Sequence, residues 1–161
     1  MIRFSIIWIS ALLITGCQHD DRDCYQNLEP KRNDDLVTIK QGIWGDIWYW
    51  EGDFMPMCPS GTIYPVERTI YVFEVANRLD VERDGYGPFY SKIHTKLIDS
   101  VLSEPGGFFQ IELDTGSYSL FVKEVGVYYA NTSNSIGISG VQVQKDQVSD
   151  FLFNITHSST W

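Results

Sequence analysis

Residues 107–122 read Gly-Phe-Phe-Gln-Ile-Glu-Leu-Asp-Thr-Gly-Ser-Tyr-Ser-Leu-Phe-Val, and this stretch decides the expected fold. Apolar and polar side chains alternate on both sides of Asp-Thr-Gly, which is typical of two strands with one buried face joined by a turn. Gly116 can take the positive φ that a tight turn needs. The side chains expected to face inward are Phe109, Ile111, Leu113, Tyr118, Leu120 and Val122. We therefore predict a β-hairpin whose register is well specified, because a one-residue slip would bury its polar side chains.

The rest of the chain from residue 36 onward also has the composition of strands. Val, Ile, Thr, Tyr, Phe and Trp are dense there, and Gly, Pro, Asn and Asp interrupt them at short intervals. Residues 77–90 are rich in turn formers, so we expect an irregular loop or a single helical turn there. Strands are expected over 36–50, 67–76, 92–102, 107–114, 117–125, 137–144 and 148–156. This pattern predicts an all-β domain over 36–157, a seven-stranded antiparallel β-sandwich.

The predicted hairpin resembles that of carboxypeptidase-regulatory-like and transthyretin-like (prealbumin-like) domains, where a Gly turn, Phe, alternating aliphatics, a second Gly turn and Tyr follow one another. Residues 42–47 resemble the first strand of that family, and residues 68–75 resemble the second. The resemblance covers roughly residues 41–156 and implies a transthyretin-like topology. Some members hydrolyse a urate derivative with a C-terminal Tyr-Arg-Gly-Ser motif. This chain closes with Ser-Ser-Thr-Trp instead, so that activity is not expected here.

The N-terminal segment has the layout of a secretory signal peptide. Arg3 precedes an apolar run over 4–14 that is too short to cross a bilayer as a stable helix, and residues 14–17 read Ile-Thr-Gly-Cys. This ending resembles the lipoprotein box of bacteria, which implies cleavage after residue 16 and acylation of Cys17. We expect residues 1–16 to be a lipoprotein signal peptide and the mature protein to be anchored at the outer membrane, facing the periplasm or the cell surface. An ordinary signal peptide followed by an incidental Cys is the alternative.

Residues 17–35 are polar and charged without apolar periodicity, which predicts a flexible acidic tether. Its acidic run over 20–23 is similar to the surface-export signal of some Bacteroidota lipoproteins, and ordinary linker charge is the alternative. Without residues 1–16 the 12 Lys and Arg lose Arg3, which leaves 11 against 21 Asp and Glu, a net charge of −10. Such a chain does not attract nucleic acid at long range and repels anionic lipid. The expected partners are the membrane, through the lipid on Cys17, and a glycan or an envelope protein.

Two cysteines remain when Cys17 carries lipid. Cys24 and Cys58 are a candidate disulfide in an oxidising envelope, and two unpaired thiols are the alternative. Closing this loop would stabilise the fold by about 3–4 kcal/mol in the chain-entropy model.

A row of tryptophans precedes the second half of the domain. Residues two apart on a strand share a face at a spacing of about 6.6 Å. Trp44, Trp48 and Trp50 therefore line up with Asp46 between them, while Ile43, Ile47 and Tyr49 face the core. Aromatic rings beside carboxylates suit a sugar-stacking face or a protein docking patch. The alternative is that residues 52–65 or the tether cover these rings as ordinary core.

Catalytic motifs are scarce. The sequence has no Gly-x-Ser-x-Gly, His-Glu-x-x-His or phosphate-binding loop, and we expect no cofactor and no metal. His19 falls in the tether and His157 in the tail, which leaves His94 inside the predicted domain. A hydrolase would require His94 to cluster with Asp99, Glu74 or Arg68 in a cleft.

Three functions follow from these observations. The leading one is a lipid-anchored accessory or binding module of the cell envelope without catalytic activity. The second is an envelope hydrolase acting on a small molecule or a glycan. The third is a structural spacer domain, which would have no exposed aromatic patch.

Overall fold

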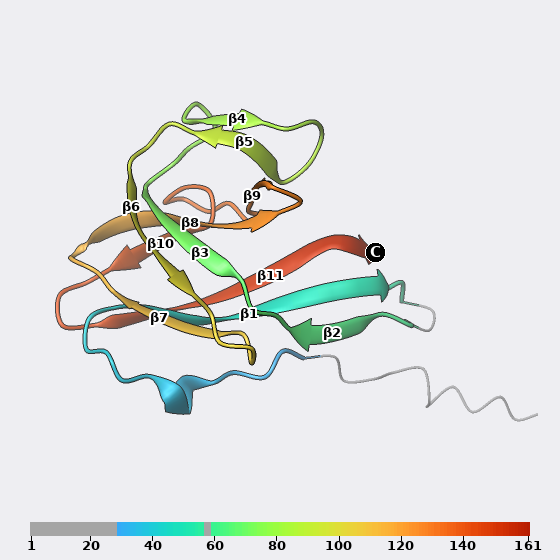
Figure 1. The fold of residues 1–161 in the computed structure, drawn as a ribbon, viewed down its shortest axis with the longest axis horizontal. Coiled ribbons are helices and arrows are strands. Elements are labelled where there is room, and N and C mark those ends of the chain that lie inside the picture. The colour runs from blue at the N-terminus through green and yellow to red at the C-terminus, as the bar shows by residue number, and fades with distance from the viewer. Residues whose placement is uncertain (1–28, 57–58) are drawn as a thin grey trace, which may run out of the picture.

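Two β-sheets pack face to face in the computed structural model, which describes residues 29–56 and 59–161 (Figure 1). Sheet A contains β1 (Gly42–Asp53), β2 (Thr62–Pro65), β7 (Phe108–Glu112) and β11 (Val148–Thr160). Sheet B contains β3 (Thr69–Glu74), β4 (Val81–Arg83), β5 (Phe89–Ile93), β6 (Leu97–Leu102), β8 (Gly116–Glu124), β9 (Val127–Tyr129) and β10 (Gly140–Val143). The all-β sandwich predicted from the sequence is confirmed.

The long strand β1 organises sheet A. It runs parallel to β11 along one side, from Gly42 opposite Val148 to Asp53 opposite Thr160. Along its other side, β7 pairs antiparallel with its first half and β2 with its second half. The β1–β11 pair is the parallel element in a fold that we expected to be antiparallel throughout.

Sheet B is antiparallel, with the order β4-β5-β9-β8-β3-β6, and β10 pairs with the first half of β8. The four strands missing from the sequence prediction are short: β2, β4, β5 and β9 contain three to five residues each. Two of them, β4 and β5, lie wholly or partly in the stretch 77–90 that we expected to be a loop. Runs of this length carry too few alternating residues to be recognised as strands.

All six side chains expected to face inward from 107–122 are buried, yet β7 and β8 do not form a hairpin. β7 pairs with β1 in sheet A, whereas β8 pairs with β3, β9 and β10 in sheet B. The Asp-Thr-Gly connection therefore carries the chain from one sheet to the other. Alternation fixes which face of a strand is buried, but it does not identify the neighbouring strand.

Both faces of β8 are covered, which the alternation did not predict. Ser119 and Phe121 point away from the sandwich core and are nevertheless fully buried. Ser119 Oγ accepts a hydrogen bond from Ala76 N at 3.0 Å, and Phe121 packs against Phe73 and Tyr90 with ring centroids 5.7 Å apart in each pair. Phe73, Tyr90 and Phe121 thus extend the one hydrophobic cluster of the described residues to the outer side of sheet B.

Candidate functional site

The outer side of sheet A carries the predicted tryptophan row. Trp44 lies opposite Gln110 and Asp150, Trp48 lies opposite Asn154 and Pro65, and Trp50 lies opposite Ile63 in the neighbouring strands. Trp50 Nε1 donates a hydrogen bond to Asn154 Oδ1 at 3.0 Å, which ties this row to β11. Ile43 and Ile47 are fully buried on the opposite side of β1, as the alternation predicts.

The three indole rings are half-buried. Arg32 stacks on Trp44, with its guanidinium carbon 4.8 Å from the ring centroid. Trp50 packs against Phe54 at 5.1 Å and Trp161 at 5.5 Å between ring centroids. The face is therefore neither fully open nor ordinary core, because all three residues are intermediate in exposure, although Trp48 Nε1 itself is buried.

Asp46 differs from the expectation that it lies open between the tryptophans. It is fully buried. Arg32 Nε lies 3.1 Å from Asp46 Oδ2, and Asn33 donates to the same carboxylate from its side-chain amide at 2.6 Å and from its backbone N–H at 3.3 Å. Arg32 and Asn33 thus satisfy the buried charge of Asp46. Through these contacts the end of the predicted tether, residues 29–35, packs against sheet A.

A second polar cluster surrounds His157. Its Nε2 lies 3.2 Å from Glu124 Oε2 and 3.4 Å from the Tyr49 hydroxyl. Arg68 Nε pairs with the other oxygen of Glu124, which is buried. The neighbouring Tyr129 is fully buried, and desolvation raises the pKa of its phenol, against the lowering effect of its hydrogen bonds with Thr156.

A β-bulge explains why two successive residues of β11 reach the same tyrosine. Tyr49 lies opposite Ile155, but Glu51 lies opposite Ser158, so β11 has one extra residue at this point. His157 and Ser158 both contact the Tyr49 hydroxyl, the latter with its Oγ at 2.7 Å. Placing His157 in a tail was wrong, because β11 extends to Thr160. The signal was available, since the alternation of Phe151, Phe153 and Ile155 continues to position 157.

The histidine chosen from the sequence lies elsewhere. His94 Nε2 pairs with Glu82 Oε1 at 2.9 Å, and both side chains are exposed. Among the described residues, no ion pair joins His94 to Asp99 or Glu74, and Arg68 pairs with Glu124 instead. Among the described residues, no group of three or more His, Cys, Asp or Glu is arranged to hold a metal ion.

Cys17, Cys24 and Cys58 lie outside the described residues, so the acylation and the disulfide stay predictions. In the part of the chain that the structure describes, no helix is long and apolar enough to cross a membrane. The chain matches no protein-family model, no curated protein and no solved structure.

Proposed function

We propose that this chain is a lipid-anchored, non-catalytic binding module of the cell envelope, and that the outer face of sheet A binds its ligand. The observation that carries the proposal is the row of partly exposed residues Trp44, Trp48 and Trp50 on one face of one strand. The lipoprotein-box resemblance at Cys17 supports the location.

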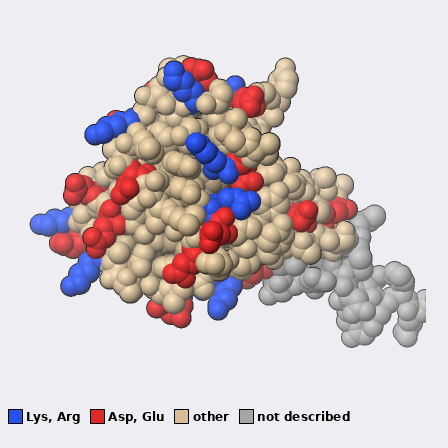
Figure 2. All heavy atoms as spheres, viewed as in Figure 1, with Lys and Arg blue, Asp and Glu red and all other residues tan. Residues whose placement is uncertain are grey.

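A glycan is the ligand class that suits this face. Indole rings stack on the apolar faces of sugar rings, and polar groups at the edge bind the hydroxyls. Asp150 and Asn154 supply such groups beside the tryptophans. Acidic and basic side chains are interspersed over the face shown in Figure 2.

Binding is tested by titrating the full-length protein with soluble oligosaccharides prepared from the cell envelope and following tryptophan fluorescence. Trp48→Ala should weaken binding at least about tenfold, as expected for loss of one stacking contact. Tyr86→Ala removes a fully exposed ring from a distant loop and serves as the matched control. Equal binding by both variants, with both folded, would exclude this face.

Anchoring is tested by Cys17→Ser. The change should release soluble protein or leave an unprocessed precursor. Membrane retention with an unchanged mature mass would contradict lipidation.

A hydrolase remains the second candidate, and one arrangement favours it. Ser158 Oγ lies 3.2 Å from His157 Nδ1, and His157 Nε2 lies 3.2 Å from Glu124 Oε2, so a hydroxyl, an imidazole and a carboxylate are connected. Two cavities lie elsewhere, one lined by residues between 40 and 118 and one lined by residues between 83 and 133. Neither is lined by Glu124, His157 or Ser158. Hydrolysis of p-nitrophenyl acetate that is lost in both Ser158→Ala and His157→Ala would support catalysis here.

A further inference from the structure

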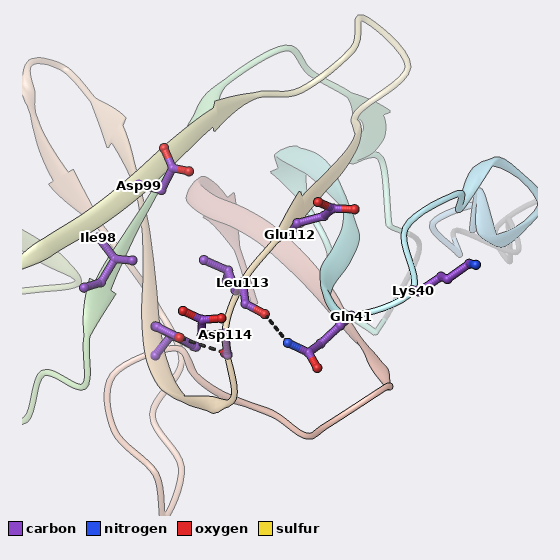
Figure 3. Close-up of a pocket in the computed structure, with 8 residues that line it drawn as sticks. Lys40, Gln41, Ile98, Asp99, Glu112, Leu113 and Asp114 are labelled. Carbon is purple, nitrogen blue, oxygen red and sulfur yellow. Dashed lines mark hydrogen bonds between the residues drawn. The ribbon is translucent and has the colours of Figure 1, made fainter.

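A groove lies between the edges of the two sheets. β6 pairs with β3 at the edge of sheet B, and β7 pairs with β1 in sheet A. The turn that joins them is closed by the hydrogen bond from Glu104 N to Phe108 O at 2.8 Å. At the other end of the two strands, β6 and the residues after β7 line an open cavity of about 510 Å³ (Figure 3). This volume is within the range of ligand pockets.

The groove has an apolar floor and charged walls. Leu113 and Tyr118 are buried at its base. Asp99 lies on the β6 side, and Glu112 and Asp114 lie on the β7 side (Figure 3). The remaining lining residues are Ile98, Lys40 and Gln41, the last of which donates to Leu113 O at 2.9 Å.

The edge of β6 is open to a further strand. Ser103 N donates to Arg68 O toward β3, so by alternation the N–H groups of Ser100 and Leu102 point away from β3. Ser100 N donates to the side chain of Asp99 at 2.7 Å instead of to a strand. Leu97, Ile98 and Leu102 are 45%, 37% and 59% exposed. An edge whose outward N–H groups pair with no strand and whose apolar side chains are exposed is a template for pairing with another chain, which would replace Asp99 as the partner of Ser100 N.

The charge of the groove favours a cationic occupant. Three carboxylates and one lysine line it, and within the described residues none of Asp99, Glu112 and Asp114 forms an ion pair. The acidic run over 20–23 of this chain has the wrong charge for the groove. We propose that the groove binds an extended basic segment of a partner protein, which pairs with β6 as an added strand. Its basic side chains face the three carboxylates, and its apolar side chains alternate with them over Leu113 and Tyr118.

The probe for this site is the fluorescein-labelled peptide Lys-Val-Lys-Val-Lys-Val, and its matched control is Glu-Val-Glu-Val-Glu-Val. Fluorescence polarisation with the full-length protein should show binding of the lysine peptide, weakening as salt increases, and at least about tenfold weaker binding of the glutamate peptide. Equal binding of the two peptides would overturn the charge argument. Failure of the lysine peptide to bind would overturn the proposal.

Strand pairing is tested at Ser100. Ser100→Pro removes an N–H that points away from β3, so it should preserve the fold and weaken the peptide at least about tenfold, whereas Ser100→Ala keeps the N–H and the affinity. Hydrogen exchange at Ser100 and Leu102 should slow when the peptide is bound, a readout on the unmodified protein that does not depend on the folding of a variant. Unchanged exchange, or equal affinity in the two Ser100 variants, would contradict pairing with β6.

The carboxylates are tested together by Asp99→Asn, Glu112→Gln and Asp114→Asn. The triple variant should lose most of the salt dependence of peptide binding, and retention of that dependence would contradict the proposed contacts. Concentration-dependent dimerisation of the free protein that is abolished by Ser100→Pro would identify a second copy as the occupant and overturn the basic partner. These tests do not involve the tryptophan face, so their failure leaves the proposed glycan site untouched.

Discussion

His157 Nε2 of sheet A lies 3.2 Å from Glu124 Oε2 of sheet B. Arg68, just before β3, pairs with the other oxygen of the same carboxylate. This contact connects the two sheets through a buried charge at the end of β8. Because a buried carboxylate is costly without partners, the two sheets are fixed relative to each other here.

Arg68→Met should destabilise the protein by about 1–3 kcal/mol, because it leaves buried Glu124 with the His157 imidazole as its remaining side-chain partner. The expected loss is below that of a fully buried pair, since Arg68 itself is about one-third exposed. The free energy of unfolding from urea titration measures it. Arg83→Met, at an exposed position in β4, should change stability by less than about 0.5 kcal/mol. Equal effects of the two changes would show that the pair contributes nothing.

Tyr129 should make stability depend on alkaline pH. Burial raises the pKa of its phenol above the ordinary value of 10.0, so the folded state holds this proton more tightly than the unfolded state. The contribution of this raised pKa to the free energy of unfolding is fully present below pH 10.0, and it is lost as the pH rises through the folded-state pKa. Urea titrations from about pH 8 to 11 should show this decline. Tyr129→Phe should flatten it, whereas Tyr86→Phe, at an exposed position, should leave it in place.

Gly45→Ala should prevent folding or cost about 3 kcal/mol or more. A Cβ at Gly45 would collide with the carbonyl oxygen of Phe151 in β11 and approach the ring of Phe109 to 2.8 Å. Gly106 has no atom within 4 Å of the corresponding position, so Gly106→Ala is the control and should be nearly neutral. Circular dichroism and thermal unfolding compare the two. A folded Gly45→Ala protein with unchanged stability would contradict the close packing of β1 against β11.

Asp46→Ala should release residues 29–35 from sheet A, because both Arg32 and Asn33 bind this carboxylate. Trypsin should then cleave after Arg32 at least several-fold faster, as followed by mass spectrometry. Asp150→Ala removes a 3.4 Å contact between Arg32 and an exposed carboxylate, so it should have little effect. Equal cleavage rates in the two variants would mean that Asp46 does not hold the segment.

The sequence predicted the buried face of β1, β7 and β8 but not their partners. Phe109, Ile111 and Leu113 alternate with polar residues because one face of their strand is buried. This alternation can be read directly from the sequence. The separation of β7 and β8 into different sheets depends on long-range pairing with β1 and β3, which no local pattern contains. Trp44, Trp48 and Trp50 share a face of β1 for the same local reason, and their role as a binding face stays a prediction. The burial of Asp46 was missed because its partners, Arg32 and Asn33, belong to a segment without periodicity.

The His157 cluster shows a different limit. Arg68, Glu124 and His157 are far apart in the sequence, and His157 meets the other two only when the two sheets pack. Continued alternation along β11 would have placed His157 inside the domain. The bulge that brings Ser158 to Tyr49 as well has no sequence signature, because one extra residue leaves the composition of the strand unchanged.

The parallel pairing of β1 with β11 has a kinetic consequence. Gly42 lies opposite Val148, so the central strand of sheet A meets this neighbour only across 106 residues of chain. Loop closure over such a distance costs entropy before any contact repays it, which makes folding slow and gives the fold a high contact order. Until β11 has been synthesised, one edge of β1 and the surrounding apolar side chains stay unpaired. Sheet A can therefore be completed only after the last described strand, β11, is available to pair with β1.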